Sequence, residues 1–561
     1  MSNENEIKEL QEEVKRLKKK LRNQEYGLIW EDKPEEVVEE CKKKIPILEE
    51  DEDRRIETDP EKPMNLLIEG DNYHALSVLN YTHQGKISVI YIDPPYNTGA
   101  KDWKYNNDYV DENDGYRHSK WLSMMSNRLK LARKLLSDDG VLICAIDENE
   151  FNRVGLLLEN IFSDHEQHCI TIVHNPRGVQ GSNFSYTHEY AFFSFHKGQK
   201  VIAHRKIKEE DIVWRNLRDN GGESLRTDAR NCFYPIIVRD EKIIGFGEVV
   251  PQNEHPDKQI LKKKDEFYIY PIDPKGIERK WRYARQSVDE IKDLLRVKKT
   301  KKGYEIELGK DYGTVRTVWQ DSRYDSNENG TKLVHALVPS THFDFPKSLY
   351  TVYDCIAPIL YENKKAIVLD FFAGSGTTGH AVSILNKEDG GDRKFILCTN
   401  NENGIAQEVC YPRIKAVIKG NKAYSDITGI SSNLKYLKTS FVDHENFSED
   451  TDSMRIKLTH RAGEMIAMRE NCHYEQKKNE DFQIFADSLK KKWMGIYFKE
   501  DKSKLSELVK ILADKKEAVI YIFGWGKNEY KNEYPEYPNI RVEDIPEPIL
   551  EVYKELNKLV S

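Results

Sequence analysis

The sequence predicts an α/β protein built on a doubly wound sheet, with an inserted domain between the two halves of the sheet. Apolar runs of strand length alternate with stretches of helical period over residues 63–198 and again over 339–440. Such alternation favours parallel strands joined by right-handed helical crossovers. Over residues 199–338 the alternation disappears, and hairpin-like pieces and basic runs replace it. We therefore expect one sheet domain in two separated halves around an insert.

Length and composition limit the class of protein. A chain of 561 residues exceeds one hydrophobic core, and its net charge of −8 means that any nucleic-acid site must be a local patch. The cysteines form no CxxC pair, and His165, His168 and Cys169 have no second ligand pair, so no metal site is expected. Without a signal peptide or a run of membrane-spanning length, the sequence predicts a cytoplasmic protein with no membrane partner.

The first segment, residues 1–62, is expected to be a helix and a tether. Between residues 4 and 22 apolar positions recur at alternating spacings of three and four, over less than three heptads. This seam indicates either an amphipathic helix lying on its own domain or a dimer contact, and both remain open. Residues 32–63 are charged and contain proline, which favours a tether or a solvated helix.

The first half of the sheet begins with a short strand that ends at Gly70-Asp71, followed by a helix from Asn72. Asp71 is either the N-cap of that helix or a carboxylate facing a ligand. Further strands are predicted at 87–92, 141–146, 170–173 and 190–195, and helices at 119–137 and up to about 162.

Asp93-Pro94-Pro95-Tyr96 directly follows the strand at 87–92. Ligands of open α/β sheets bind beyond the carboxyl ends of the strands, so Asp93 lies where chemistry is expected. The prolines stiffen the loop and leave carbonyls available as acceptors. A carboxylate, a carbonyl and an aromatic ring together suit an amino group on a planar heterocycle. The alternative is an Asp-Pro turn with a surface tyrosine.

The insert holds a predicted hairpin, strands 234–238 and 242–246 turning at 239–240, and several basic runs. Arg279, Lys280, Trp281 and Arg282 interleave cations with an aromatic ring, a mixture that contacts phosphates and base faces. With Arg177, in the polar loop 175–181, these residues are the DNA-binding candidates. The alternative is a solvated charged surface.

The second half places a glycine-rich turn after a strand at 366–369. Gly374, Gly376 and Gly379 satisfy GxGxxG where a helix begins. Asp370 could face a cationic amino group, Phe371 and Phe372 wall the turn, and Thr377 and Thr378 replace apolar residues expected under a pyrophosphate. This pattern fits the amino acid and ribose of S-adenosylmethionine better than a nicotinamide nucleotide. A strand at 395–399, a helix near 413–420, and a small α/β domain over 441–561 complete the chain.

These two motifs carry a family resemblance. Asp93-Pro94-Pro95-Tyr96 resembles the catalytic motif of amino-methyltransferases, and the loop from Phe372 to Gly376 resembles their S-adenosylmethionine loop. Their order, with a polar insert between them, is similar to that of β-class DNA adenine-N6 methyltransferases, and in particular to the modification subunit of type III restriction-modification systems. Wider matches lie at 29–34, 67–72, 118–121, 343–347 and 398–403.

The resemblance implies a circularly permuted class I methyltransferase fold with a seven-stranded mixed sheet, S-adenosylmethionine as cofactor and double-stranded DNA as substrate. It implies a restriction subunit with helicase and nuclease activity as a partner, and a homodimer. By position, Asp71 would face the cofactor's adenine, and Asp370, Phe372, Gly374, Gly376 and Thr377 its other end. Phe345 and Lys347 fall in the motif that closes over the cofactor. Family members often hold the ribose with an acid after the second strand, where this chain offers Asn400 or Glu402.

The expected reaction is methylation of the N6 amino group of an adenine flipped out of the duplex. Asp93 and the Pro94 carbonyl would accept the two amino hydrogens, and Tyr96 would stack on the base. Three alternatives compete with this interpretation: a catalytically vestigial recognition subunit, a cytosine-N4 methyltransferase, and a nicotinamide-dependent oxidoreductase. The last leaves the Asp-Pro-Pro-Tyr loop unexplained.

Overall fold

The computed structural model describes residue 14 and residues 30–560, apart from gaps at 99–115, 181–182, 204, 207–209, 211, 301–302, 311, 342, 344–345, 421–427, 444–451, 527–528 and 531–533. Except for Val14, the predicted heptad seam lies outside the described residues, and so does Phe345. The chain forms two compact units, residues 1–202 with 316–561, and residues 203–315. None of the described helices combines the length and apolar character needed to cross a bilayer.

The first unit is organised around a ten-stranded sheet with the order β1-β21-β2-β20-β19-β3-β4-β8-β5-β18. Its strands are β1 (Lys44–Glu50), β2 (Met64–Glu69), β3 (Ile87–Ile92), β4 (Leu136–Ile146), β5 (His165–Val173), β8 (His188–His196), β18 (Val318–Trp319), β19 (Ile367–Asp370), β20 (Lys394–Thr399) and β21 (Asn433–Asp443). The five strands from β2 to β4 in this order are parallel, and β8 is antiparallel to both of its neighbours. The central seven strands, β2 to β5, form the expected mixed sheet.

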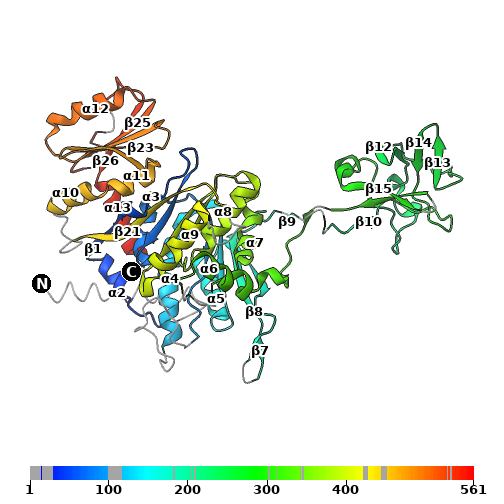
Figure 1. Cartoon of the computed structure of the whole chain (residues 1–561), viewed down its shortest axis with the longest axis horizontal. Helices are drawn as coiled ribbons and strands as arrows, with labels where there is room; N and C mark the ends of the chain where they lie inside the picture. The colour runs from blue at the N-terminus through cyan, green and yellow to red at the C-terminus, as the bar shows by residue number, and fades with distance from the viewer. Residues whose placement is uncertain are drawn as a thin grey trace. The chain divides into compact units, whose positions relative to one another are not determined.

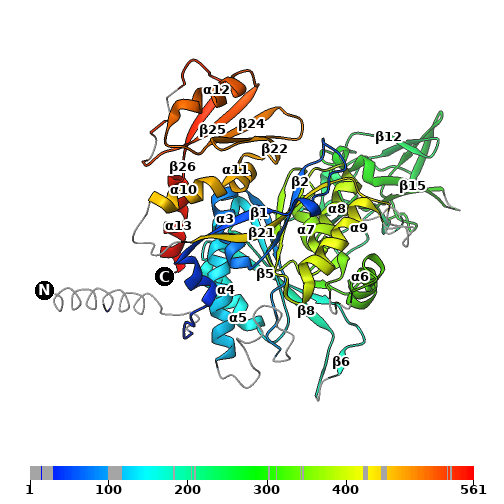
Figure 2. The same cartoon turned by 60° about the vertical axis from the view of Figure 1, so that its left-hand side comes forward.

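Helices cover both faces of this sheet, which confirms the doubly wound architecture (Figures 1 and 2). The helices α3, α4 and α5 pack side by side, and α7, α8 and α9 form a second group, with the sheet between the two groups in Figure 2. The bounds are α2 (Glu36–Cys41), α3 (Asn72–Thr82), α4 (Arg117–Leu135), α5 (Phe151–Ile161), α6 (Lys332–Leu337), α7 (Leu349–Leu360), α8 (Thr377–Asp389) and α9 (Tyr411–Lys419).

The tether expected over residues 32–63 is wrong, because this segment contains α2 and the edge strand β1. The strand pairs antiparallel with β21, and Ile45, Ile47 and Leu48 are fully buried. Pro46 is compatible with an edge strand, which needs no amide donor on its outer side. The sheet therefore has three strands more than the resemblance implies, because β1 and β21 extend one edge and β18 the other.

The compact insert is shorter than the 199–338 expected, since residues 316–338 belong to the first unit. There β18 pairs with β5, and α6 packs against α9. Within the insert, β11 and β12 form the predicted hairpin. Its strands are β9 (Arg205–Lys206), β10 (Arg215–Asn216), β11 (Ile236–Arg239), β12 (Lys242–Phe246), β13 (Ile260–Lys263), β14 (Glu266–Ile269), β15 (Leu295–Thr300), β16 (Gly303–Leu308) and β17 (Tyr312–Gly313).

The C-terminal segment has its own five-stranded sheet, and its helices α11 and α13 pack on α3 of the first unit. The sequence predicts a helix at 461–468, and α11, which begins at Gly463, confirms it; a second helix, α10, precedes it and ends at Arg461. The elements are α10 (Asp452–Arg461), α11 (Gly463–Glu470), β22 (Tyr474–Lys478), β23 (Phe482–Ala486), β24 (Lys492–Tyr497), α12 (Leu505–Ala513), β25 (Glu517–Phe523), β26 (Ile540–Ile545) and α13 (Glu547–Val560).

In the first unit, a short hairpin, β6 (Val179–Gln180) with β7 (Ser185–Tyr186), lies between β5 and β8 in the chain.

Candidate active site

The loop after β3 is held by hydrogen bonds from α4 and from the turn before α5. The Pro95 carbonyl accepts from Trp121 Nε1 at 2.7 Å, and Asn97 Nδ2 donates to Glu150 Oε1 at 2.5 Å. Asn97 adopts a left-handed conformation with φ of 56°, which asparagine tolerates better than most residues. Asp93 is thus presented from a fixed loop, with 26% of its side chain exposed.

A buried charge cluster surrounds Asp93. Lys347 Nζ lies 3.1 Å from Asp93 Oδ1 and 2.8 Å from Glu189 Oε2, and it donates to the Tyr96 hydroxyl. The Tyr96 hydroxyl in turn donates to Glu189 Oε2 at 3.2 Å. Lys347, which falls in the motif expected to close over the cofactor, therefore contacts the catalytic loop. Glu189, in β8, is a site residue that no sequence motif indicated.

The protonation of these groups reflects burial and their shared cation. Burial raises the pKa of Asp93, although Lys347 opposes the shift. Burial also acts to raise the pKa of Glu189, but the charges of Lys347 and His174, together with hydrogen bonds from Lys347 and Tyr96, lower that pKa overall. The pKa of Lys347 is raised, because the two carboxylates outweigh the effect of burial. At neutral pH, Lys347 and Glu189 are therefore both charged.

The glycine-rich turn joins β19 to α8 and contains two left-handed glycines. Gly374 has φ of +51°, and Gly376, the N-cap of α8, has φ of +80°. A Cβ at Gly376 would lie 3.0 Å from Cys410 Sγ, so this glycine allows α9 to pack closely. A Cβ at Gly374 would meet nothing closer than 3.9 Å. The backbone at Gly374 is consequently open to a ligand.

Asp370 and Thr378 hold this turn together. Asp370 Oδ1 accepts from the Phe372 amide at 3.0 Å, and its Oδ2 accepts from the Thr378 hydroxyl at 2.5 Å. Burial raises the pKa of Asp370 to about 7, against the lowering effect of these bonds. Both carboxyl oxygens of Asp370 therefore hold the turn. Phe372 is buried beside Phe371, with ring centres 5.2 Å apart.

Arg413, from α9, lies fully buried beneath the same turn, and no sequence pattern indicated it. Its guanidinium donates to Ser375 Oγ at 2.9 Å and to Thr377 Oγ1 at 2.8 Å. Burial lowers its pKa to about 10. The Thr377 hydroxyl, one of the expected cofactor contacts, therefore accepts a hydrogen bond from Arg413.

The two loops share one edge of the sheet. Strands β19 and β3 are parallel neighbours, with Leu369 paired to Ile90. Asp370 and Asp93, at the ends of these strands, therefore lie at the same edge of the sheet, and the charge of Asp93 contributes to the raised pKa of Asp370. This adjacency joins residues that are 277 positions apart in the chain (370 − 93).

The remaining cofactor candidates lie along the same edge. Asp71 caps α3, since its Oδ1 accepts from the Tyr73 amide at 2.7 Å. Asn400 and Glu402 follow β20, which is parallel to β2 with Glu69 opposite Thr399. Both oxygens of Glu69 already accept from Gln407, at 2.9 and 3.0 Å. Asp71, Asn400 and Glu402 thus extend the edge that begins at the glycine turn.

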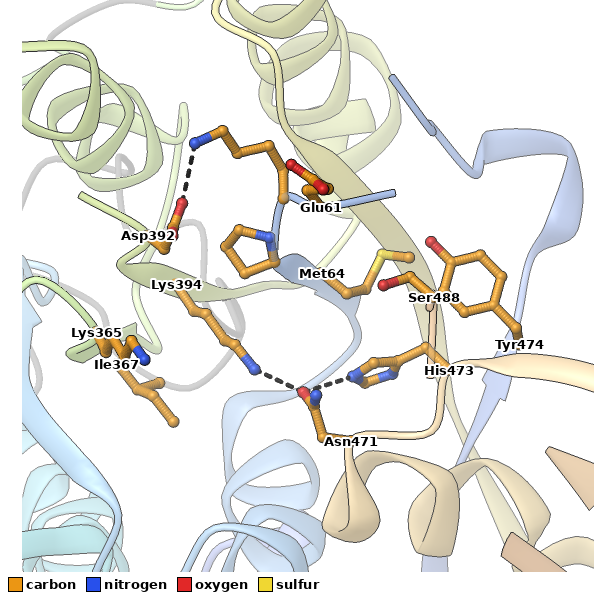
Figure 3. A pocket seen from close by; sticks show the side chains of 12 residues that line it. Glu61, Met64, Lys365, Ile367, Asp392, Lys394, Asn471, His473, Tyr474 and Ser488 are labelled. Atoms are coloured by element: carbon orange, nitrogen blue, oxygen red, sulfur yellow. Dashed lines mark hydrogen bonds and ion pairs between the residues drawn. The ribbon is translucent and has the colours of Figure 1, made fainter. Parts of the chain in front are cut away.

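A cavity of about 360 Å³ lies at the other end of the strands (Figure 3). Its lining includes Met64, Ile367 and Lys394 at the amino ends of β2, β19 and β20. Figure 3 shows Lys394 reaching Asn471 of the C-terminal segment, a hydrogen bond of 2.5 Å. Because parallel sheets bind their ligands at the carboxyl ends, this cavity is separate from the candidate active site.

The DNA-binding candidates of the insert divide into buried and exposed residues. Trp281 as a platform for bases is wrong, since its ring is 2% exposed in the core and its indole donates to the Tyr234 carbonyl at 2.7 Å. Arg279 pairs with Asp273 at 3.1 Å, and Lys280 lies 4.0 Å from Asp219. Arg282 is exposed, and so is Arg177 in the first unit.

One group of possible metal ligands occurs among the described residues: Asp164, His165 and His196, with ligand atoms within 4.8 Å of one another. The guanidinium of Arg133 already pairs with the Asp164 carboxylate, with Nη2 2.8 Å from Oδ1. The sequence pattern instead groups His165 with His168 and Cys169.

Comparisons with known proteins identify relatives of this chain. Residues 87–440 match the family described as DNA methylase. The type II methyltransferase M.KpnI of Klebsiella pneumoniae is 32% identical, over 67% of this chain and 88% of its own length. The Mod subunit of the type III restriction-modification enzyme EcoPI of Escherichia phage P1 is 28% identical, over 64% of this chain and 60% of its own length. Among solved structures, a putative DNA modification methylase of Thermus thermophilus, complexed with S-adenosyl-L-methionine, aligns with a TM-score of 0.31 and 10% identity, over 66% of this chain and 98% of that one.

Proposed function

This chain belongs to the DNA methylase family, and from this premise we propose that it transfers a methyl group from S-adenosylmethionine to the N6 amino group of adenine in double-stranded DNA. The observation that carries the proposal is the adjacency of β19 and β3. It brings a glycine turn able to hold a methyl donor beside a loop able to hold an amino group. A reaction between two bound molecules requires such juxtaposition.

The glycine turn fits the methyl donor. The open backbone at Gly374 offers close approach, and the N-terminus of α8 favours a carboxylate such as that of the donor's methionine part. Asp71, Asn400 and Glu402, farther along the same edge, are the candidates for holding its adenosine part. Asp370 and Arg413 shape the turn from below. When bound, S-adenosylmethionine supplies an electrophilic methyl group on a positively charged sulfur.

The loop after β3 prepares the nucleophile. The exocyclic nitrogen of adenine is a weak nucleophile, because its lone pair is conjugated with the ring. Asp93 and the Pro94 carbonyl accept its two N–H hydrogens, which favours a lone pair directed at the methyl group. The amino nitrogen would take up the methyl group that S-adenosylmethionine supplies, and Asp93 would pass the surplus N–H proton to solvent. Tyr96 stacks on the base and offsets part of its unstacking cost, a few kcal/mol.

Adenine rather than cytosine is proposed because the catalytic loop begins with Asp93, a pattern that resembles N6-adenine enzymes. We further propose that the chain is a modification subunit that acts with a separate restriction subunit, as the name of the EcoPI relative indicates for that protein. Contacts to the DNA backbone are assigned to Arg177 and Arg282, whose exposed guanidinium groups can reach phosphates.

The test is transfer of a labelled methyl group from S-adenosylmethionine to DNA, followed by chromatography of the nucleosides. The proposal predicts label in N6-methyl-2′-deoxyadenosine. Label in N4-methyl-2′-deoxycytidine would contradict the assignment of the base, while absence of any label in DNA would contradict the proposed function as a whole.

A further inference from the structure

The cluster of Asp93, Tyr96, Glu189 and Lys347 is built from distant parts of the chain. Asp93 and Tyr96 follow β3, Glu189 lies in β8, and Lys347 precedes α7. Glu189 is 4% exposed and Lys347 12% exposed, so the pair is largely removed from water. Lys347 contacts the other three side chains, and Glu189 contacts both Lys347 and Tyr96.

This arrangement costs free energy that a packed apolar core would not. Burying charges is unfavourable unless they pair well, and replacing a buried pair with apolar residues is often neutral or stabilising. Here one ammonium is shared by two carboxylates, so the three charges sum to −1. Stability alone would need neither the second carboxylate nor a cation facing the loop, and a role in the chemistry of Asp93 is the better explanation.

We propose, resting on the methyl-transfer function above, that Lys347 and Glu189 are positioning residues that together set the charge and orientation of the catalytic loop. Lys347 keeps Asp93 ionised in a buried site. Glu189 shares Lys347, so that the ammonium does not neutralise Asp93 completely.

The separate roles of Lys347 and Glu189 follow from the need for Asp93 to accept a hydrogen bond from the amino group. Only the ionised carboxylate accepts an amino hydrogen with both oxygens available, and burial alone would favour the protonated acid. A cation bound to Asp93 alone would keep the carboxylate ionised but would weaken it as an acceptor. Glu189 draws the ammonium partly away, and the Tyr96 hydroxyl, bonded to both charges, fixes the ring that stacks on the base.

Substitution of the two residues should shift the pH profile of the single-turnover rate of methyl transfer in opposite directions. In Lys347→Met the cation is lost, so the pH below which the rate falls should rise by about 1–3 units. In Glu189→Gln, which is nearly isosteric, Lys347 pairs with Asp93 alone. The pH below which the rate declines should then be lower than in the wild type, and the rate at the plateau should be lower as well.

Other titratable groups near the cluster do not reproduce this pair of shifts. Burial raises the pKa of Asp147 to about 6, and the charge of Lys347 acts to lower it. Burial raises the pKa of Asp370 to about 7, and among the cluster only Asp93 acts on it. Burial moves the remaining groups toward their neutral forms. They are Tyr91 in β3, Cys144 in β4, His174 after β5 and Cys355 in α7.

The experiment compares the wild-type protein, Lys347→Met, Lys347→Arg and Glu189→Gln on DNA substrate. Lys332→Met, which removes an exposed lysine of α6, is the matched control and should keep the wild-type profile. Lys347→Arg retains the charge and should keep the pH of half-maximal rate close to wild type. A merely structural role would lower rates at all pH values without moving the profile.

Opposite shifts in Lys347→Met and Glu189→Gln support the proposal, and unchanged profiles or shifts in one direction overturn it. If Lys347→Met does not fold or is inactive at every pH, Glu189→Gln alone decides. A pH of half-maximal rate in Glu189→Gln that equals or exceeds that of the wild type overturns the proposal. A wild-type protein without methyl transfer would refute the proposed function instead, so the two failures are distinguishable.

Discussion

The two left-handed glycines of the turn after β19 allow packing to be separated from binding. Gly376→Ala places a Cβ 3.0 Å from Cys410 Sγ and 3.4 Å from Ile414, whereas the Cβ of Gly374→Asp would meet nothing closer than 3.9 Å, an ordinary contact distance. A left-handed conformation costs about 1–2 kcal/mol for a residue with a Cβ, and overpacking about 1–3 kcal/mol more. Gly376→Ala should therefore lose about 2–5 kcal/mol of stability, and Gly374→Asp no more than about 2 kcal/mol.

For binding of S-adenosylmethionine, we expect Gly374→Asp to be the more damaging of the two substitutions. A carboxylate at Gly374 would occupy the open side of the turn and repel the carboxylate of the methyl donor. We expect its affinity to fall by at least about 100-fold, or roughly 2.7 kcal/mol. Gly376→Ala points away from this side and should bind the donor far better, once folded.

Denaturant unfolding measures the two stabilities, and titration calorimetry with S-adenosylmethionine measures the two affinities. Folded Gly374→Asp that binds the donor with wild-type affinity would refute the assignment of the turn. Equal losses of stability in the two variants would refute the packing argument.

The remaining predictions concern the turn and the insert. Burial raises the pKa of Asp370 to about 7 from its ordinary 3.8, so the wild type should lose stability relative to Asp370→Asn as the pH rises between these values. Thermal melts at several pH values check this, and a difference independent of pH contradicts it. Trp281→Ala should cost roughly 3–5 kcal/mol in denaturant unfolding, and an unchanged midpoint would place the ring outside the core. Arg282→Ala should stay within about 0.5 kcal/mol of wild type and reduce the salt slope of DNA binding by about one. An unchanged slope would remove Arg282 from the DNA contacts.

Much of the sheet domain follows from local patterns. The apolar runs before Gly70, Asp93 and Gly374 are long enough to predict buried strands, and each is followed by a turn that is readable from sequence. The principle that strand ends share a crevice then joins the two motifs, and the pairing of β19 with β3 confirms it.

Other features depend on contacts that no local pattern records. The lysines and the proline around Ile45 and Ile47 concealed an edge strand whose burial comes from β21, far along the chain. Trp281 lies between basic residues in a segment without periodicity, so nothing in the sequence distinguished an inward ring from an outward one.

The charge cluster likewise depends on contacts between segments that are far apart in the chain. Glu189 and Lys347 reach Asp93 only after three segments of the chain have come together, and neither residue has a neighbour in sequence that suggests the other. A motif search finds residues that are close in sequence, whereas this site is assembled across the sheet.

The most direct test of the central claim is the rate of methyl transfer to DNA by Asp93→Ala, measured beside its DNA binding. We expect that transfer to adenine is abolished, because no carboxylate accepts the amino hydrogen, while DNA binding is largely retained. Methyl transfer by Asp93→Ala at the wild-type rate would contradict the account.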